Sequence, residues 1–359
     1  MILKNYIIKS SILSCCFFFL LSACNYIKEQ GGEAKLPESV GDFAELVIVG
    51  DKQSTEILNQ GIEHVYGKAV DGIAPPAEPM YKVRYTDETY FKGFFQKHVT
   101  IAMLLHKGNI DLFAHYFNKE AIDKIRNKIE KGESGFVGVN NVWAKPQKVN
   151  FIFASNASAL KDWMINNAEK LRKSALTNET QIGIAKIFGA NIYSDSFFVN
   201  HFNKSGYALP KAPSFRIAAN RPDFIWLRKD GKKYDYGIYI YDEPYTDKNQ
   251  LTEAYILELR NKMTKKYIHG TLDSTYVTIE PLLKPVSKVI SFNSMYAIET
   301  RGWWKLEHDY MGGPFVLYTI YDEKSGKIIT LDGNVFAPNE PKVAYLRELE
   351  VILHALKTK

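Results

Sequence analysis

Short apolar runs and stretches with helical spacing alternate along the first half of the chain. The run Glu45-Leu46-Val47-Ile48-Val49-Gly50 predicts a buried strand, and Ser54 is expected to cap a helix with one apolar face. Strands are predicted at 81–85, 99–105 and 149–153, helices at 121–129 and 160–171, an extended connection at 73–79 and a loop at 132–138. The pattern therefore mixes helices and strands.

The segment 200–213 interrupts this pattern. It is polar and irregular and contains Gly206, Pro210 and Pro213, which is typical of a boundary between two structural units. Beyond it, strands are predicted at 215–217, 224–226, 236–241, 276–278, 295–298, 315–320 and 328–331, and helices at 251–263 and from Pro341 to 356. The residues Lys229-Asp230-Gly231 indicate a hairpin turn between two of these strands.

These elements predict an α+β protein with two halves, 42–205 and 206–359. Each half is expected to form an antiparallel or mixed sheet with helices packed on one face. A weak echo between Asn141-Val142-Trp143-Ala144-Lys145-Pro146 and Asn334-Val335-Phe336-Ala337-Pro338 suggests that the halves are related, although chance similarity explains it equally well.

The N-terminal apolar run has the features of an export signal. Lys4 and Lys9 precede apolar residues 12–21, and this run has about half the length that a helix needs to cross a bilayer. It ends in Leu21-Ser22-Ala23-Cys24, which has the form of a bacterial lipobox. We predict a lipoprotein signal peptide at 1–23, lipidation of Cys24, and a flexible tether at 24–41.

Composition narrows the choice of partners. Among 359 residues, 46% are apolar and 24% are charged, as in ordinary globular proteins. The formal net charge of +6 becomes +4 once Lys4 and Lys9 leave with the signal, and the basic residues form no concentrated stripe. Nucleic-acid binding would require such a stripe, so this class is excluded.

No cofactor and no metal are predicted. Two of the three cysteines, Cys15 and Cys16, lie inside the signal, and lipid would cap Cys24. Thiolate metal sites and catalytic cysteines are therefore excluded from the mature chain. The eight histidines have no zinc-binding spacing, and the sequence contains no dinucleotide-binding or Walker motif.

The densest group of chemically capable residues lies at 299–315. Glu299 and Arg301 are two residues apart, so they share one face of a strand and are placed to form a charged pair. His308 and Asp309 have the chemistry of a base and its orienting acid, and Trp304 offers an aromatic surface. The alternative is purely structural: a strand-locking ion pair, a core tryptophan and a glycine-rich turn.

Several fragments, taken in order, resemble a known family. They are Leu36-Pro37-Glu38-Ser39-x-Gly41, Glu78-Pro79, Trp143-Ala144-x-Pro146-Gln147, Asp223-Phe224-Ile225-Trp226, Gly237-Ile238-x-Ile240-Tyr241, Arg301-Gly302-x-Trp304, Met311-Gly312-Gly313-Pro314-Phe315, Val335-x-Ala337-Pro338 and Leu346-Arg347-x-Leu349-Glu350. Together these fragments resemble the Bacteroidetes lipoprotein family known as domain of unknown function 4837, over nearly all of the mature chain. The resemblance implies a lipid anchor and an envelope location, and it implies no activity.

The chain departs from that family in two places. It has Arg260-Asn261 where the family tends to have Arg-Asp, and Tyr276-Val277-Thr278 where the family favours Tyr-Met-Thr. If the family's aspartate acts as a base, Asn261 cannot replace it, because an amide does not take up a proton at neutral pH.

Two functional hypotheses follow. The first is a cell-envelope lipoprotein, held at the inner or outer membrane by Cys24, whose body in the periplasm or at the cell surface binds an envelope protein or a glycan. The second is an envelope hydrolase acting on glycan or peptide, with ligand-contacting residues among Glu299, Arg301, Trp304, His308 and Asp309. The second requires these side chains to converge in one open cleft.

Overall fold

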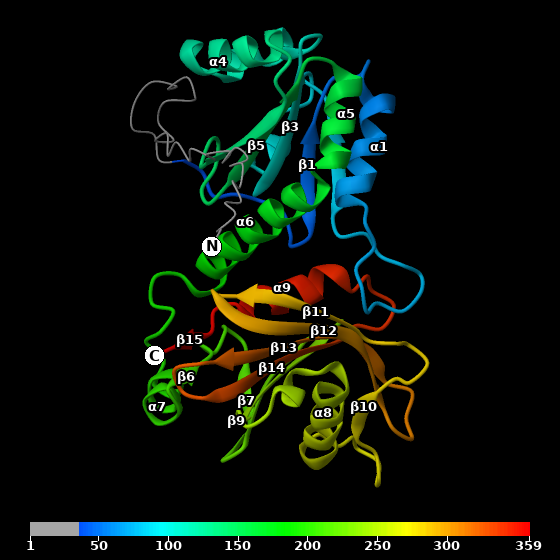
Figure 1. Ribbon diagram of the computed structural model, residues 1–359, viewed down its shortest axis with the longest axis vertical. Coiled ribbons are helices and arrows are strands. Elements are labelled where there is room, and N and C mark those ends of the chain that lie inside the picture. Colours follow the sequence, from blue (N-terminus) through cyan, green and yellow to red (C-terminus); the bar gives the residue numbers. More distant parts are fainter. Residues whose placement is uncertain (1–35) are drawn as a thin grey trace, which may run out of the picture.

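The two halves of the chain form two separate sheets, stacked along the long axis of the molecule (Figure 1). This computed structural model describes residues 36–359, so the predicted signal peptide, Cys24 and most of the predicted tether lie outside the described residues. The predicted α+β class in two halves is confirmed. No helix in the described part of the chain is both long and apolar enough to span a bilayer.

The first half has a mixed five-stranded sheet. Its strands are β1 (Glu45–Val49), β2 (Lys82–Thr86), β3 (Thr100–His106), β4 (Gly135–Asn140) and β5 (Lys148–Ala154). Its helices are α1 (Thr55–Tyr66), α2 (Phe94–Lys97), α3 (Ile110–Phe113), α4 (Lys119–Glu130), α5 (Ala157–Asn166) and α6 (Ala168–Phe188), with a 3-10 turn at Ala114–Tyr116. The spatial order is β2-β1-β3-β5-β4, in which only β4 runs antiparallel to its neighbour.

The second half has an eight-stranded antiparallel sheet. Its strands run β10-β12-β13-β14-β9-β8-β7, and β11 also pairs with β12. They are β7 (Arg216–Arg221), β8 (Phe224–Asp230), β9 (Asp235–Pro244), β10 (Val277–Ile279), β11 (Val286–Phe292), β12 (Met295–Leu306), β13 (Gly312–Asp322) and β14 (Lys327–Phe336). The remaining elements are α7 (Ser196–Ser205), a 3-10 turn at Lys248–Leu251, α8 (Glu253–Tyr267), α9 (Val343–Leu353) and the short pair β6 (Tyr207–Ala208) and β15 (Lys357–Thr358).

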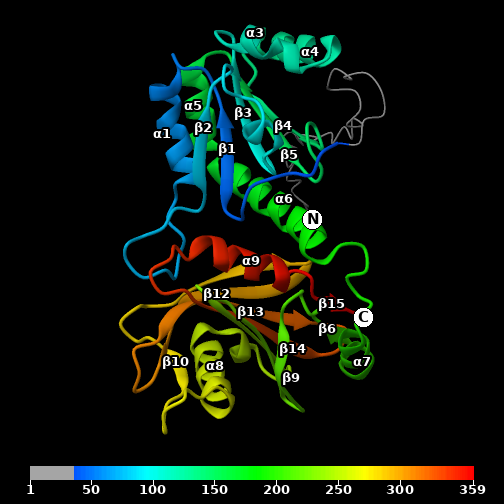
Figure 2. The ribbon, with the colours of Figure 1, turned by 180° about the vertical axis from the view of Figure 1, so that it is seen from behind.

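Helices cover both faces of each sheet, whereas the sequence predicted one covered face. In the first half, α1, α5 and α6 pack on one face and α3 and α4 on the other. Figure 2 shows this arrangement from behind. In the second half, α9 packs on one face and α8 on the other. The physical reason is that central strands such as β3 and β13 are apolar on both sides, so both faces require cover.

The two halves are built differently. The first sheet is mainly parallel and the second is antiparallel, with different strand orders. The two members of the sequence echo also occupy different positions: residues 141–146 connect β4 to β5, whereas Asn334 to Phe336 end β14.

Three local predictions were wrong. Ser54 makes no side-chain capping bond to α1, because its hydroxyl lies 2.8 Å from a ring nitrogen of His106. The segment predicted as a loop at 132–138 contributes β4, which pairs with β5. The single helix predicted at 160–171 is interrupted at Asn167, and its continuation runs to Phe188.

Helix α9 joins the two halves. It lies between α6 and the second sheet (Figures 1 and 2). The carboxylate of Glu78, from the first half, accepts hydrogen bonds from the backbone N–H groups of Lys342 and Val343 at 2.7–3.0 Å. An acid from one half therefore caps the first turn of a helix in the other.

A buried ion pair lies under α8. Arg260 and Asp332 are both fully buried, with their Nε and Oδ2 atoms 2.9 Å apart. The guanidinium also donates to Asn334 at 2.6 Å and lies 3.9 Å from the ring centre of Phe315. This pair ties α8 to the middle of the sheet.

We expect Asp332→Asn to lower the free energy of unfolding by about 3–5 kcal/mol, because it leaves the charge of Arg260 buried without a counter-charge. Urea unfolding followed by circular dichroism measures this loss. The matched control is Asp223→Asn, which breaks an exposed pair with Lys266 and is expected to cost less than about 1 kcal/mol. Equal losses in the two variants would contradict this assignment.

Candidate functional site

The five predicted ligand-contacting residues lie on or just after β12, and the alternation of a strand separates them. Glu299 and Arg301 point towards α9, while Trp304, an odd number of residues further on, packs in the cluster under α8. The sheet itself therefore stands between the charged pair and the tryptophan. These side chains do not converge in one cleft.

Glu299 and Arg301 form the charged pair that their spacing predicted, and they extend it. Arg301 Nε donates to Glu299 at 2.7 Å and its Nη1 donates to Glu350 of α9 at 2.6 Å. The side chains of Glu299 and Arg301 are only 9% and 11% exposed. Arg301 is therefore almost buried and already holds two carboxylates of the protein through Nε and Nη1, which disfavours it as the contact for an anionic ligand.

The charges around Glu299 keep its carboxyl ionised. Burial opposes the charged form, but the cations of Arg301 and Lys288 outweigh burial and lower the pKa of Glu299 to about 2. A carboxylate with so low a pKa is a poor proton donor or acceptor at neutral pH. The geometry and the charge together remove the support for a hydrolase that uses Glu299.

The α8 face of the second sheet carries a cavity of about 260 Å³, which we call the aromatic pocket. It lies between β8, β9, β12 and β14 on one side and the segment after α8 on the other. Its lining includes the aromatic residues Trp226, Tyr239, Trp304 and Phe336 and the polar residues Arg228, Asp235, His269, Asp309 and Asn334. The mixture of flat apolar rings and a few polar groups is typical of a small-molecule site.

Trp304 and the glycines that follow it build the floor of the aromatic pocket. The indole Nε1 of Trp304 donates to the carbonyl of Val335 at 3.1 Å, which fixes the ring across the sheet. A Cβ atom on Gly313 would lie only 1.9 Å from that same carbonyl oxygen, so this close approach requires glycine. The second glycine of the Met-Gly-Gly-Pro-Phe motif is therefore explained by the close approach of β13 to β14 beside the pocket.

His308 and Asp309 occupy the turn between β12 and β13. His308 is exposed and has a φ of +64°, a conformation that histidine adopts more readily than most residues. Asp309 lines the aromatic pocket, and one of its oxygens accepts from the backbone N–H of Tyr310 at 2.6 Å. No hydrogen bond joins His308 to Asp309 in the described structure, so the predicted base and its orienting acid are not formed.

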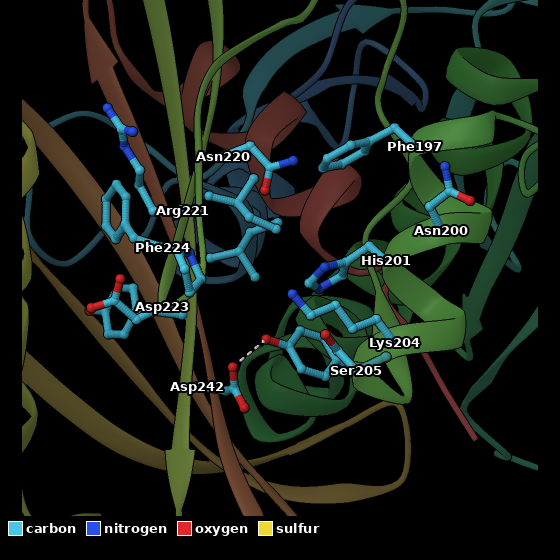
Figure 3. Close-up of a pocket in the computed structure, with 15 residues that line it drawn as sticks. Phe197, Asn200, His201, Lys204, Ser205, Asn220, Arg221, Asp223, Phe224 and Asp242 are labelled. Atoms are coloured by element: carbon cyan, nitrogen blue, oxygen red, sulfur yellow. Dashed lines mark hydrogen bonds between the residues drawn. The ribbon is translucent and has the colours of Figure 1, made fainter.

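A second cavity, of about 220 Å³, lies between α7 and the strands β8 and β9. Figure 3 shows Phe197, His201 and Lys204 extending from α7 towards these strands. The hydroxyl of Tyr207 donates to Asp242 at 3.0 Å. Burial lowers the pKa of His201, so its ring is neutral at neutral pH. The cavity is polar and contains both His201 and Ser205, but no hydrogen bond joins these two side chains within the described residues.

A third polar cluster lies where β1 and β3 end, at the point where the strand order of the first sheet reverses. Such points bind ligands in many open α/β sheets. Here Asp51 lies 2.8 Å from the amide nitrogen of Asn109 and 3.1 Å from Nε2 of His106, and Ser54 lies 2.8 Å from that same nitrogen. The backbone N–H of Gly108 donates to Nδ1 of His106, so the ring proton is on Nε2. Because Nε2 already carries the proton, it cannot accept a proton from Ser54. The hydrogen bonds of this cluster instead join the loop after β1 to the end of β3.

The described residues contain no group of three or more histidine, cysteine or acidic side chains placed to hold a metal ion. Asn261, which replaces an aspartate of the resembled family, accepts from the backbone N–H of Ile279 at 3.0 Å and from the hydroxyl of Thr278 at 3.1 Å. It therefore ties α8 to β10, a role that an aspartate oxygen fills equally well.

Comparison with known families divides the chain in the same way as the two sheets. Residues 198–355 match the family model described as a domain of unknown function, DUF4837. Residues 39–187 match a different one, DUF8532, which is also a domain of unknown function. None of the curated proteins matches the chain. The expected resemblance to the first family therefore holds for the second half only, and the motifs at 78–79 and 143–147 belong to the other domain.

Sequence reasoning missed most of the aromatic pocket. It identified Trp304 and Asp309, but it did not connect them with Trp226, Arg228 and His269. These residues come from strands and loops far apart in the chain. The one available signal was the alternation of aromatic residues on β8 and β9, which places Trp226 and Tyr239 on the same face.

The low pKa of Glu299 generates a prediction about acid stability. A carboxyl whose pKa falls on folding, from 4.5 to about 2, stabilises the native state above pH 4.5. That contribution, on the order of 3 kcal/mol, is lost as the pH falls from about 4.5 to 2. We expect Glu299→Gln to be less stable at pH 7 and to lose less stability across this range.

Urea midpoints measured between pH 7 and pH 2.5 test this. Glu323→Gln, at an exposed position in the turn between β13 and β14, is the matched control and is expected to follow the unsubstituted protein. An acid dependence in Glu299→Gln as steep as that of the control would refute the assignment.

Proposed function

We propose that this protein is a lipoprotein of the bacterial cell envelope, anchored through lipidated Cys24, whose folded body acts as a binding module. The lipobox at residues 21–24 supports the anchor. The aromatic pocket supports the binding role, since it is a concave cavity with rings and polar groups and without a catalytic arrangement.

The location of the pocket agrees with attachment at the N-terminus. Residues Glu38 and Val40 pair with Lys145 and His98, so the chain enters the body on the first half. Helix α8 and strand β10, which border the pocket, lie at the opposite end of the molecule (Figures 1 and 2). About a dozen residues separate Cys24 from Leu36, a reach of at most about 40 Å. The pocket therefore lies at the end of the body that is farther from the point of attachment.

The anchor accounts for stable attachment only if the cysteine carries more than one chain. A single acyl chain binds a bilayer weakly and reversibly, whereas two or more hold a protein durably. We therefore propose a diacylated or triacylated Cys24, with the body in the periplasm or at the cell surface.

We expect Cys24→Ala to move the protein from the membrane fraction to the soluble fraction, because the thioether link to the lipid cannot form. Cell fractionation with immunoblotting measures the distribution, and mass spectrometry of the unsubstituted protein measures the added lipid mass. Cys15→Ala and Cys16→Ala, within the predicted signal, are the matched controls and should leave the protein membrane-bound. A Cys24→Ala variant that still sediments entirely with membranes would refute the anchor.

A further inference from the structure

The two tryptophans of the aromatic pocket are held differently. Trp304 is 7% exposed, and its indole N–H is bonded to Val335, so it is part of the floor. Trp226 is half-buried, and its Nε1 has no hydrogen-bond partner in the described structure. Its ring meets Tyr239 edge to face at 75°, with the guanidinium of Arg228 5.7 Å from the ring centre. The ring packs against the cluster under α8, and because it is only half-buried, part of it is available to a ligand.

The polar groups of the pocket supply both donors and acceptors without an excess of positive charge. Arg228 is already paired with Asp230 and Asp235. The Nε2 of His269 lies 3.0 Å from the carbonyl of Lys265 and donates to it, which leaves Nδ1 as an acceptor. Asp309 bonds the backbone through one oxygen, and its other oxygen makes no hydrogen bond within the described residues. A phosphate or sulfate would meet no unpaired cation here.

The rim of the pocket carries one more aromatic ring. Tyr310, next to Asp309 in the turn after β12, is fully exposed, with a relative accessibility of 106%. Leu272, in the loop after His269, is also 60% exposed. The two loops lie against each other, since the backbone N–H of Glu307 donates to the carbonyl of Tyr276. The apolar surface of the pocket therefore continues outward beyond its polar groups.

We infer that the aromatic pocket binds an uncharged carbohydrate, with Trp226 as the surface on which a sugar ring stacks. The C–H groups on one face of a sugar are slightly positive and match the electron-rich face of an indole. The hydroxyl groups around the ring need donors and acceptors in equal measure, which Arg228, His269 and Asp309 provide. Tyr310 carries the next sugar unit outside the cavity. This inference rests on the proposed binding function and names the class of ligand.

The size and lining of the pocket favour this class over others. A cavity of about 260 Å³ is near the lower limit for small-molecule sites, which fits one ring rather than an extended chain. Acyl chains are disfavoured, because an apolar ligand would bury Asp309 and His269 without replacing the hydrogen bonds that they make to water. Anionic ligands are disfavoured by the two aspartates that already pair with Arg228.

The experiment uses the full lipidated protein in micelles of a detergent without a sugar headgroup. Binding of cellohexaose, maltohexaose, mannohexaose and chitohexaose is followed by titration calorimetry, with a heparin hexasaccharide as the anionic comparison. We expect at least one neutral oligosaccharide to bind more tightly than the heparin fragment. Trp226→Ala is expected to weaken that binding about 10-fold or more, and Tyr310→Ala about 3-fold.

Tyr310 is fully exposed, so its substitution tests the site without endangering the fold. Tyr90→Ala, at an exposed tyrosine of the first half, is the matched control and should bind as the unsubstituted protein does. Thermal unfolding verifies that each variant is folded. Asp309→Asn, which keeps the shape of the side chain and removes its charge, is expected to weaken binding less than Trp226→Ala does.

Three results would overturn the inference. They are the absence of binding to all four neutral oligosaccharides, binding that Trp226→Ala and Tyr310→Ala leave unchanged, and preference for the heparin fragment. Capture of members of a synthetic peptide library through Trp226, without glycan binding, would overturn the carbohydrate class and leave the binding function standing. A body that binds neither glycan nor peptide would overturn both.

Discussion

A buried chain of alternating charges holds the two halves of this protein together. Arg347 of α9 donates to Glu179 of α6 at 2.7 Å and also lies 2.9 Å from Glu350. Glu350 in turn accepts from Arg301, and Arg301 donates to Glu299, which also pairs with Lys288. Three acids therefore balance three bases along a line that begins in the first half and ends on the outer strand of the second sheet.

The balance of this charge chain is what makes it tolerable inside the protein. Every charge except that of Lys288, whose side chain is 55% exposed, loses most of its hydration. This cost is offset only while each buried member keeps an oppositely charged partner. Burial disfavours the charged form of Arg347, but Glu179 and Glu350 outweigh burial and raise its pKa further. Removing one member exposes its neighbours to the full cost of burial, so the two halves are coupled through this line.

The charge chain also decides where a ligand can bind. It uses Glu299 and Arg301, the most reactive-looking pair in the sequence, to join β12 to α9. Helix α9 and the first half pack over that face of the second sheet, where the described cavity lies beside α7. The opposite face is only partly covered by α8, and the uncovered end forms the aromatic pocket. The ion pairs of β12 thus occupy its α9 face, and the aromatic pocket lies on its α8 face.

Much of the fold could be predicted from the sequence, because the spacing of apolar residues and the residue types that turns prefer are local properties. The strand at 45–50, the hairpin at 229–231 and the Glu299–Arg301 pair all follow from residues close together in the chain. The loop predicted at 132–138 failed because its glycines resemble a turn, whereas pairing with β5 supplies the missing hydrogen bonds. Ser54 failed as a cap for a related reason, since His106, from a distant strand, is its neighbour.

The sequence by itself determined which residues share a face of a strand or helix, the likeness of residues 21–24 to a lipidation signal, and the confinement of the three cysteines to the first 24 residues. These follow from spacing and residue type. Only the tertiary structure decided that Arg301 pairs with Glu350, that Trp226 and Trp304 line one cavity, and that no hydrogen bond joins His308 to Asp309 among the described residues. Such contacts depend on which face of a sheet each helix covers. The burial of apolar surface over the whole fold determines this placement, and a local sequence pattern does not contain that information.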